Sequence, residues 1–372
     1  MKKFLVFVTV FMFASFAFAE RTYTLKLAST WENTTPVLGK TANDFKKYAE
    51  TMSNGRLKIR IDTPSKHKAG FGILDFVKSG QYELGYTSLY YYKGKDPKTM
   101  FWTAVPFGMT TAEQHAWYYY GGGKELNEKL FDKYGIKTFI MGTTGMQMGG
   151  WFKKEINSLA DLQGLKFRIP GFGGEVMSKL GVTINTIPTG ELYMALEMGT
   201  IDAVEWVSPV YDMPLGFHKV AKYYYTGWQE PTGDTQLLIN KNVYDKLPED
   251  LRLILEAAAR MAGENMQNSG FYQNSVIWQK MKKEFPDVTI KNFPPDVMEA
   301  LKKATDEILD EEAAKDPLFK EILDSQRNFL KIGREWNKIS ETAYINNQNE
   351  NMPKFPQISE TNSTVKEQNL SK

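Results

Sequence analysis

The sequence contains no cysteine among its 372 residues and only three histidines. Without cysteine the chain can form no disulfide bond and has no thiolate for metal binding or nucleophilic attack. The three histidines, His67, His115 and His218, are isolated and lack the paired spacing of a zinc site. These absences exclude thiol chemistry and argue against a histidine-based metal centre.

An excess of charge of one sign is also missing. The chain has 46 basic and 44 acidic residues, and two of the basic ones, Lys2 and Lys3, lie in an N-terminal leader, so 44 of each sign remain. A balanced surface attracts neither nucleic acid nor an anionic membrane. We therefore expect no nucleic-acid partner.

Residues 1–19 have the pattern of a cleaved secretory signal peptide. Two lysines open the chain, an apolar run follows, and Ala17-Phe18-Ala19 forms a small-x-small cleavage site. A membrane anchor is the alternative, but the apolar run is shorter than the ~20 residues that a spanning helix needs. An exported chain without disulfide bonds is typical of the bacterial periplasm, which is the location we predict.

Two stretches of alternating strand and helix patterns follow the leader. In the first, the pattern predicts strands at residues 23–28, 57–62 and 84–88, separated by helices at 37–52 and 73–79. In the second, it predicts strands at residues 167–169, 183–187 and 203–207, separated by helices at 174–180 and 191–198. This rhythm is typical of parallel sheets covered by helices. The predicted fold class is α/β, a two-lobe periplasmic binding protein fold with a ligand cleft between the lobes and long C-terminal helices.

The remainder of the chain is mainly helical. Apolar periodicity predicts one helix over residues 248–282 and a final helix over residues 318–344. Beyond this point Asn, Gln, Ser and Lys dominate, which is typical of disorder. The predicted organisation is lobe 1 at 20–145 with a return segment near 233–270, lobe 2 at 146–232 with later return segments, a C-terminal helical region at 271–345, and a disordered tail at 346–372.

The last predicted helix carries an apolar stripe. Ile322, Phe329 and Trp336 are spaced seven residues apart, with Ile332 and Ile339 beside them. Such a stripe packs either against the core of its own chain or against a helix from a second copy. A homodimer through the C-terminal helix is therefore one of two open interpretations.

A single arginine, Arg168, is the most informative residue of the chain. It lies between Gln147 and the pair Glu205-Trp206, and all of these fall at the ends of short strand-like runs. A guanidinium group matches the two coplanar oxygens of a carboxylate, where lysine offers only a point charge. No nucleophile lies nearby, so the segment favours a site that holds a small organic anion with a counter-cation. A salt bridge at the surface or at the edge of the core is the competing interpretation of such an arginine.

Three consecutive tyrosines at residues 90–92 are further candidates. Neighbours on a strand point to opposite faces, so the three side chains cannot all point inward. We expect at least one hydroxyl to reach the cleft, and Tyr91 is our candidate. Packing in the core is the competing interpretation of each ring.

The order and spacing of several motifs resemble one known family. These motifs are Asp161-Leu-Gln-Gly-Leu-Lys-Phe-Arg168, Leu180-Gly181, Pro188-Thr-Gly-Glu-Leu-Tyr193, Ala195-Leu196, Gly199 and Asp202-Ala-Val-Glu-Trp206. In them the chain resembles, over residues 22–344, the solute-binding component of a tripartite ATP-independent periplasmic (TRAP) transporter. Other segments are similar to the branch of that family that captures 2-oxo and 2-hydroxy monocarboxylates with a metal cation. They are Gln147-Met-Gly-Gly-Trp-Phe152, Tyr90-Tyr-Tyr92, Ala104-Val-Pro-Phe-Gly108 and Tyr223-Tyr-Tyr-Thr-Gly-Trp-Gln-Glu230.

The resemblance implies roles for particular residues. Arg168 would clamp the carboxylate of the acid, and the metal ligands would be Gln147, Glu205, Trp206 through its backbone carbonyl, and Glu230. The implied substrate-binding set is Arg168, Gln147, Tyr91, Trp206 and Glu205. Oxygen ligands of this kind suit sodium or calcium. The implied protein partners are the membrane permease subunits of a TRAP transporter.

Other functions remain open at this point. An exported enzyme, such as a metal-assisted lyase or hydrolase acting on organic acids, would need a positioned general base. Glu205 is the candidate in this segment, and metal binding would occupy it, so we expect no enzyme. Binding of dicarboxylates and ligand sensing for a signalling partner would use the same site.

Overall fold

The computed structural model describes residues 21–185, 187 and 189–351. The predicted signal peptide and residues 352–372 of the predicted tail lie outside these described residues. Within the described part, no helix is both long and apolar enough to cross a membrane.

The first sheet contains the first predicted β-α-β-α-β stretch. Its strands are β1 (Tyr23–Ser29), β2 (Leu57–Asp62), β3 (Leu84–Thr87), β4 (Ile136–Thr143) and β10 (Asp234–Asn240), in the order β2-β1-β3-β10-β4. The first three strands are parallel, as predicted, whereas β10 runs antiparallel to both of its neighbours. The sheet and the helices around it are called lobe 1 below.

The second sheet has six strands and forms the centre of lobe 2. The strands are β5 (Gly150–Phe152), β6 (Lys166–Arg168), β7 (Thr183–Asn185), β8 (Ala203–Val204), β9 (Tyr223–Tyr225) and β11 (Thr289–Lys291), in the order β11-β9-β5-β8-β6-β7. The predicted strands β6, β7 and β8 pair in parallel, and β5 lies antiparallel to β8 and β9. Two separate sheets confirm the predicted α/β class and its two lobes.

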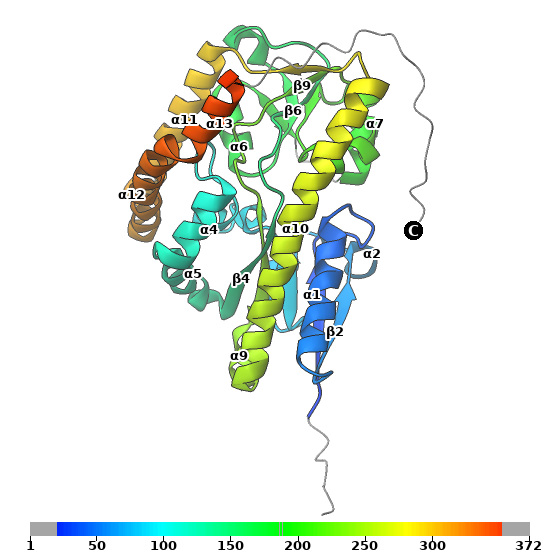
Figure 1. Ribbon diagram of the computed structural model, residues 1–372, viewed down its shortest axis with the longest axis vertical. Helices are drawn as coiled ribbons and strands as arrows, with labels where there is room; N and C mark the ends of the chain where they lie inside the picture. The colour runs from blue at the N-terminus through cyan, green and yellow to red at the C-terminus, as the bar shows by residue number, and fades with distance from the viewer. Residues whose placement is uncertain (1–20, 186, 188, 352–372) are drawn as a thin grey trace, which may run out of the picture.

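Helices cover the sheets (Figure 1). The α-helices are α1 (Leu38–Met52), α2 (Pro64–His67), α3 (Ile73–Lys78), α4 (Thr111–Tyr120), α5 (Gly123–Phe131), α6 (Gly171–Lys179), α7 (Leu192–Glu197), α8 (Pro209–Asp212), α9 (Lys241–Lys246), α10 (Glu249–Glu284), α11 (Pro295–Lys315), α12 (Pro317–Ile339) and α13 (Glu341–Asn351). The 3₁₀ helices are η1 (Leu89–Tyr92), η2 (Pro97–Trp102), η3 (Asp132–Tyr134), η4 (Leu159–Leu162), η5 (Thr189–Glu191), η6 (Met213–Leu215) and η7 (Phe217–Lys219).

Two extended segments connect the lobes side by side. Residues 144–149 lead from β4 to β5, and residues 226–233 lead back from β9 to β10. They are hydrogen bonded to each other, from Thr144 N to Gly233 O at 3.0 Å and from Gln147 N to Glu230 O at 3.0 Å. The predicted lobe boundary at residues 145 and 146 falls within the first of these bridging segments.

The long helix α10 is the third connection (Figure 1). Its backbone approaches β4 closely at Gly263. This approach requires a glycine, because a Cβ at residue 263 would come within 2.9 Å of Gly142 N. Further along the helix, Asn274 Oδ1 accepts hydrogen bonds from Ser208 Oγ at 3.2 Å and Val210 N at 2.8 Å in lobe 2. One helix therefore packs against both lobes, which limits the ways in which they can move.

Three local predictions were wrong. Residues 89–92 form the 3₁₀ helix η1 rather than a strand, so the argument from alternating strand faces does not apply to the three tyrosines. The final predicted helix is interrupted at Ser340, where φ is −112° and ψ is −105°, and α13 then begins at Glu341. Residues 346–351 belong to α13 and not to a disordered tail.

The apolar stripe of α12 packs against the core of its own chain in its first half and is uncovered in its second half. Ile322 is fully buried and Phe329 packs partly against the core of the same chain. Ile332, Trp336 and Ile339, in contrast, are 61%, 64% and 72% exposed. The first half of the stripe is core, and the second half is an uncovered apolar face.

Candidate binding site

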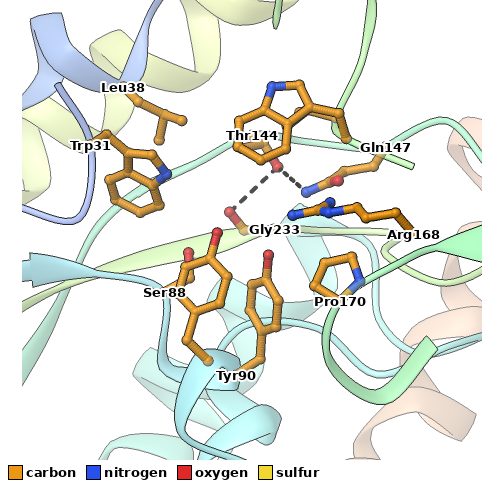
Figure 2. A pocket seen from close by; sticks show the side chains of 12 residues that line it. Trp31, Leu38, Ser88, Tyr90, Thr144, Gln147, Arg168, Pro170 and Gly233 are labelled. Carbon is orange, nitrogen blue, oxygen red and sulfur yellow. Dashed lines mark hydrogen bonds between the residues drawn. The ribbon is translucent and has the colours of Figure 1, made fainter. Parts of the chain in front are cut away.

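A pocket lies between the lobes, where the bridging segments meet the strand ends (Figure 2). Its walls come from lobe 1, from lobe 2 and from the bridging segments. Lobe 1 provides Trp31, Leu38, Ser88, Tyr90 and Tyr91; the bridging segments provide Thr144, Gln147 and Gly233; lobe 2 provides Arg168, Pro170, Trp206 and Val207. Four of the five predicted site residues that were expected to touch substrate, Arg168, Gln147, Tyr91 and Trp206, are among them.

Arg168 is the last residue of β6, and its side chain is 5% exposed. Its Nη1 donates a hydrogen bond to the backbone oxygen of Glu205 at 2.6 Å, and it lies 3.7 Å from Glu205 Oε2. The guanidinium carbon also lies 5.2 Å from the centre of the Trp206 ring, a favourable cation–π position. These contacts fix the guanidinium group at the pocket wall, where Figure 2 shows it pointing inward.

The expected metal ligands gather beside Arg168 and contain oxygens without partners. Gln147 Oε1, Glu205 Oε1, Glu205 Oε2 and Glu230 Oε2 are all buried and accept no hydrogen bond from any described residue. The amide of Gln147 is oriented by its other end, because Nε2 donates to Thr144 Oγ1 at 3.0 Å (Figure 2). Buried acceptors without donors are unfavourable, so several such oxygens together point to a cation.

The electrostatics of the two carboxylates support the same conclusion. Burial raises the pKa of Glu205 well above its usual range, the nearby Glu230 carboxylate raises it further, and Arg168 opposes both effects. Burial raises the pKa of Glu230 to about 8, again against the influence of Arg168. One guanidinium group is therefore too little positive charge for two buried carboxylates.

The donor set fits a hard cation. It consists of two carboxylates and an amide oxygen, and oxygen ligands of this kind bind calcium and sodium rather than zinc or copper. The described part of the chain contains no group of three or more His, Cys, Asp or Glu side chains that could hold a metal ion by themselves. Here the amide oxygen of Gln147 and the backbone carbonyl of Trp206 would complete the coordination by Glu205 and Glu230.

Asp212 supports the strand end that carries Glu205 and Trp206. Its carboxylate accepts hydrogen bonds from Trp151 Nε1 at 3.0 Å, Tyr224 OH at 2.7 Å and Val207 N at 3.0 Å. Burial raises the pKa of Asp212 to about 6, and these hydrogen bonds counteract the rise. Asp212 was not predicted as a functional residue, because only the folded chain brings Trp151 and Tyr224 to it.

The lobe 1 wall of the pocket was also largely missed. Tyr90 lines the pocket together with Tyr91, and the two rings lie 4.5 Å apart. Ser88, Leu38 and Trp31 belong to a strand end, a helix start and a loop that carry no motif. Their position after the first and third predicted strands was the one available signal, because parallel strands end at the same edge of a sheet.

Comparison with known proteins agrees with this geometry. The family model for bacterial extracellular solute-binding proteins, family 7, matches residues 27–316, and the chain belongs to this family. It is 41% identical over 302 residues to a monocarboxylate 2-oxoacid-binding periplasmic protein of Nostoc sp., covering 81% of this chain and 82% of that protein.

Two solved structures of TRAP periplasmic solute-binding proteins are similar to the fold. One, from Colwellia psychrerythraea, holds calcium and pyruvate; it is 52% identical, has a TM-score of 0.87, and the match covers 88% of this chain and 100% of that one. The other, from Pseudoalteromonas atlantica, holds sodium and pyruvate; it is 50% identical, has a TM-score of 0.85, and the match covers 88% and 99%.

Proposed function

We propose that this protein captures a small 2-oxo or 2-hydroxy monocarboxylate together with a calcium or sodium ion and delivers it to a TRAP permease. The observation that carries the proposal is the group of buried, unpartnered oxygens of Gln147, Glu205 and Glu230 beside the guanidinium group of Arg168. Arg168 binds the carboxylate of the acid. The cation joins the acid to the protein oxygens.

The charges of the site favour one acid group and one cation. Two glutamates and the carboxylate of the acid carry three negative charges, and Arg168 offsets one. A divalent ion balances the remaining two, and a monovalent ion does so with one proton retained on a glutamate. Arg168 is the one cationic side chain among the pocket-lining residues, all of which lie in the described part of the chain, so a second carboxylate would lack a partner. This argues for monocarboxylates over dicarboxylates.

The ligands of the relatives support the choice of acid. The Nostoc relative is named for monocarboxylate 2-oxo acids, and both solved structures hold pyruvate with calcium or sodium. A cation next to the carboxylate can also bind the oxygen at C2, which gives a physical reason for selecting 2-oxo and 2-hydroxy acids.

We further propose that the acid is held and not converted. Glu205 and Glu230 would both be occupied by the cation, which leaves neither free to act as a general base. Closing of the two lobes around the acid is the expected conformational step. The predicted leader would export the chain to the periplasm, where the permease subunits are accessible. Ligand sensing would use the same closing step.

Calorimetry with pyruvate, lactate and succinate in the presence of calcium tests this function. We expect one-to-one binding of pyruvate and lactate, and at least about tenfold weaker binding of succinate, because its second carboxylate must be buried without a partner. Tighter binding of succinate would contradict the assignment, and turnover of any of these acids would contradict the binding-only role.

The raised pKa values predict that cation binding releases protons. Glu205 and Glu230 bind protons more tightly in the folded protein than in the unfolded chain, so the cation-free protein should lose stability as the pH rises from about 5 to 8. Calcium requires both carboxylates to be deprotonated, and its affinity should rise about tenfold per pH unit for each proton released. Calorimetry in buffers of different ionisation enthalpy measures the number of protons.

Matched variants separate this effect from other titrations. Glu230→Gln removes one of the two carboxylates, so we expect it to reduce the number of protons released. Glu175→Gln changes a half-buried carboxylate of α6, which is paired with Lys93 and does not line the pocket, and should leave that number unchanged. Equal proton release by the wild type and Glu230→Gln would show that Glu230 is not involved.

We also propose that the uncovered apolar face of α12 forms a homodimer with a second copy of the chain. Trp336 follows Ile332 by four residues and Ile339 follows Trp336 by three, so the three side chains share one face of the helix. Tyr344 and Ile345 continue the exposed apolar surface on α13. A helix face of this kind can pair with its own copy around a two-fold axis.

Sedimentation measurements test the dimer. The wild-type protein should sediment as a dimer at micromolar concentration, and the double variant Ile332→Glu/Trp336→Glu as a monomer, because burial of apolar area drives such pairing. Lys331→Glu lies on another side of the same helix and serves as a control. A monomeric wild type would end this proposal without affecting the binding site.

A further inference from the structure

The turn that precedes α1 is strained. Val37 has φ 58° and ψ −59°, a backbone conformation that is unfavourable for a β-branched residue. It forms a γ-turn, in which Leu38 N donates to Pro36 O at 2.6 Å. Strain of this kind persists only where the surrounding structure enforces it, and it is concentrated at functional sites.

The surroundings of Val37 do enforce the turn. Val37 is buried, and its backbone oxygen accepts hydrogen bonds from Thr41 N at 2.9 Å and Thr41 Oγ1 at 3.0 Å. Gly39 N donates to Thr35 O at 2.9 Å. A side chain at Gly39 would clash with the backbone, since its Cβ would be 2.3 Å from Asn33 O. The loop is thus packed against itself and leaves little room for the turn to relax.

The strained turn places Leu38 in the pocket wall. Leu38 is 2% exposed and lies near Trp31, on the side of the pocket opposite Arg168 (Figure 2). Trp31 is also fixed, because its backbone N–H donates to Ser29 Oγ at 3.1 Å and its ring packs edge-on against Tyr86 at 4.9 Å. The pocket therefore has a charged end at Arg168 and a rigid apolar end at Leu38 and Trp31.

We propose that Leu38, held in place by the turn at Val37, forms with Trp31 the end wall that limits the carbon-chain length of the bound acid. This inference rests on the proposed function, in which Arg168 and the cation hold the carboxylate and the C2 oxygen. With that end of the acid fixed, its remaining carbons extend toward Leu38 and Trp31. Each further methylene group must then displace a side chain whose backbone is fixed.

Titration calorimetry with pyruvate, 2-oxobutanoate and 2-oxopentanoate, at saturating calcium, tests this role of Leu38. In the wild type, affinity should fall with each added methylene group. Leu38→Ala should raise the ratio of the affinity for 2-oxopentanoate to that for pyruvate about tenfold, since only the longer acid fills the new space. Leu38→Val removes less volume and should show a smaller shift in the same direction.

Leu57→Ala is the matched control. Leu57 is a fully buried leucine of β2 that packs in the same apolar cluster but does not line the pocket. It should lower the melting temperature without changing the ratio of affinities for pyruvate and 2-oxopentanoate. An unchanged ratio in the folded Leu38→Ala and Leu38→Val proteins would overturn the proposal while leaving the proposed function intact. Failure of the wild type to bind any 2-oxo acid would instead overturn the proposed function.

Discussion

Replacement of Arg168 by lysine is expected to weaken binding of pyruvate by at least about a hundredfold, although the positive charge is kept. Loss of one partner of a buried, charge-assisted pair costs about 2–5 kcal/mol, and each 1.4 kcal/mol is a factor of ten. Lysine cannot present two parallel N–H groups to a carboxylate. It also cannot both reach the acid and keep the 2.6 Å hydrogen bond that Arg168 donates to the Glu205 backbone.

Calorimetry at saturating calcium measures this loss, and Arg60→Lys is a suitable control. Arg60 lies on β2, has a side chain that is 62% exposed, and does not line the pocket. The control should bind pyruvate as the wild type does. Undiminished affinity in Arg168→Lys would mean that a simple point charge is sufficient, and undiminished affinity in Arg168→Ala would remove Arg168 from the binding site.

How well the sequence predicts each part of the fold depends on how far apart along the chain the interacting residues are. The strands at residues 57–62 and 84–87 and the helix at 38–52 were predicted nearly to their ends, because local apolar periodicity determines them. The insertion of β10 between β3 and β4 was not predicted. That pairing joins residues about 150 positions apart, and no local pattern encodes it.

The candidate site follows the same rule. Arg168, Glu205 and Trp206 belong to neighbouring strand ends of one sheet, so a single run of motifs brought them together. Trp31 lies in the loop between β1 and α1, and Leu38 is the first residue of α1. Their role depends on the position of the other lobe and on a positive φ at Val37. A valine gives no sign in the sequence that it adopts such a conformation, since the surroundings and not the residue favour it.

Removal of the cation should have an effect on acid binding as large as the loss of Arg168. Chelation of calcium removes the ion that holds the oxygens of the acid. The two buried glutamates, whose pKa values are raised, are then either protonated or repel the carboxylate of the acid, with only Arg168 to offset that repulsion. We expect affinity for pyruvate to fall at least about a hundredfold, which corresponds to a coupling of about 3 kcal/mol between the two ligands. Such coupling is reciprocal, so pyruvate should tighten calcium binding by the same factor.

Glu205→Gln tests the origin of this coupling at nearly constant side-chain volume. Both carboxylate oxygens of Glu205 lack a hydrogen-bond donor within residues 21–185, 187 and 189–351, so the variant should lose calcium affinity and, with it, most of its affinity for pyruvate. The same change removes a buried charge, and the cation-free variant should therefore melt at a higher temperature than the cation-free wild type above neutral pH. If Glu205 served only as the internal partner of Arg168, the substitution would instead lower the melting temperature and leave calcium dependence unchanged. The two interpretations thus predict opposite signs in one thermal-unfolding experiment with and without calcium.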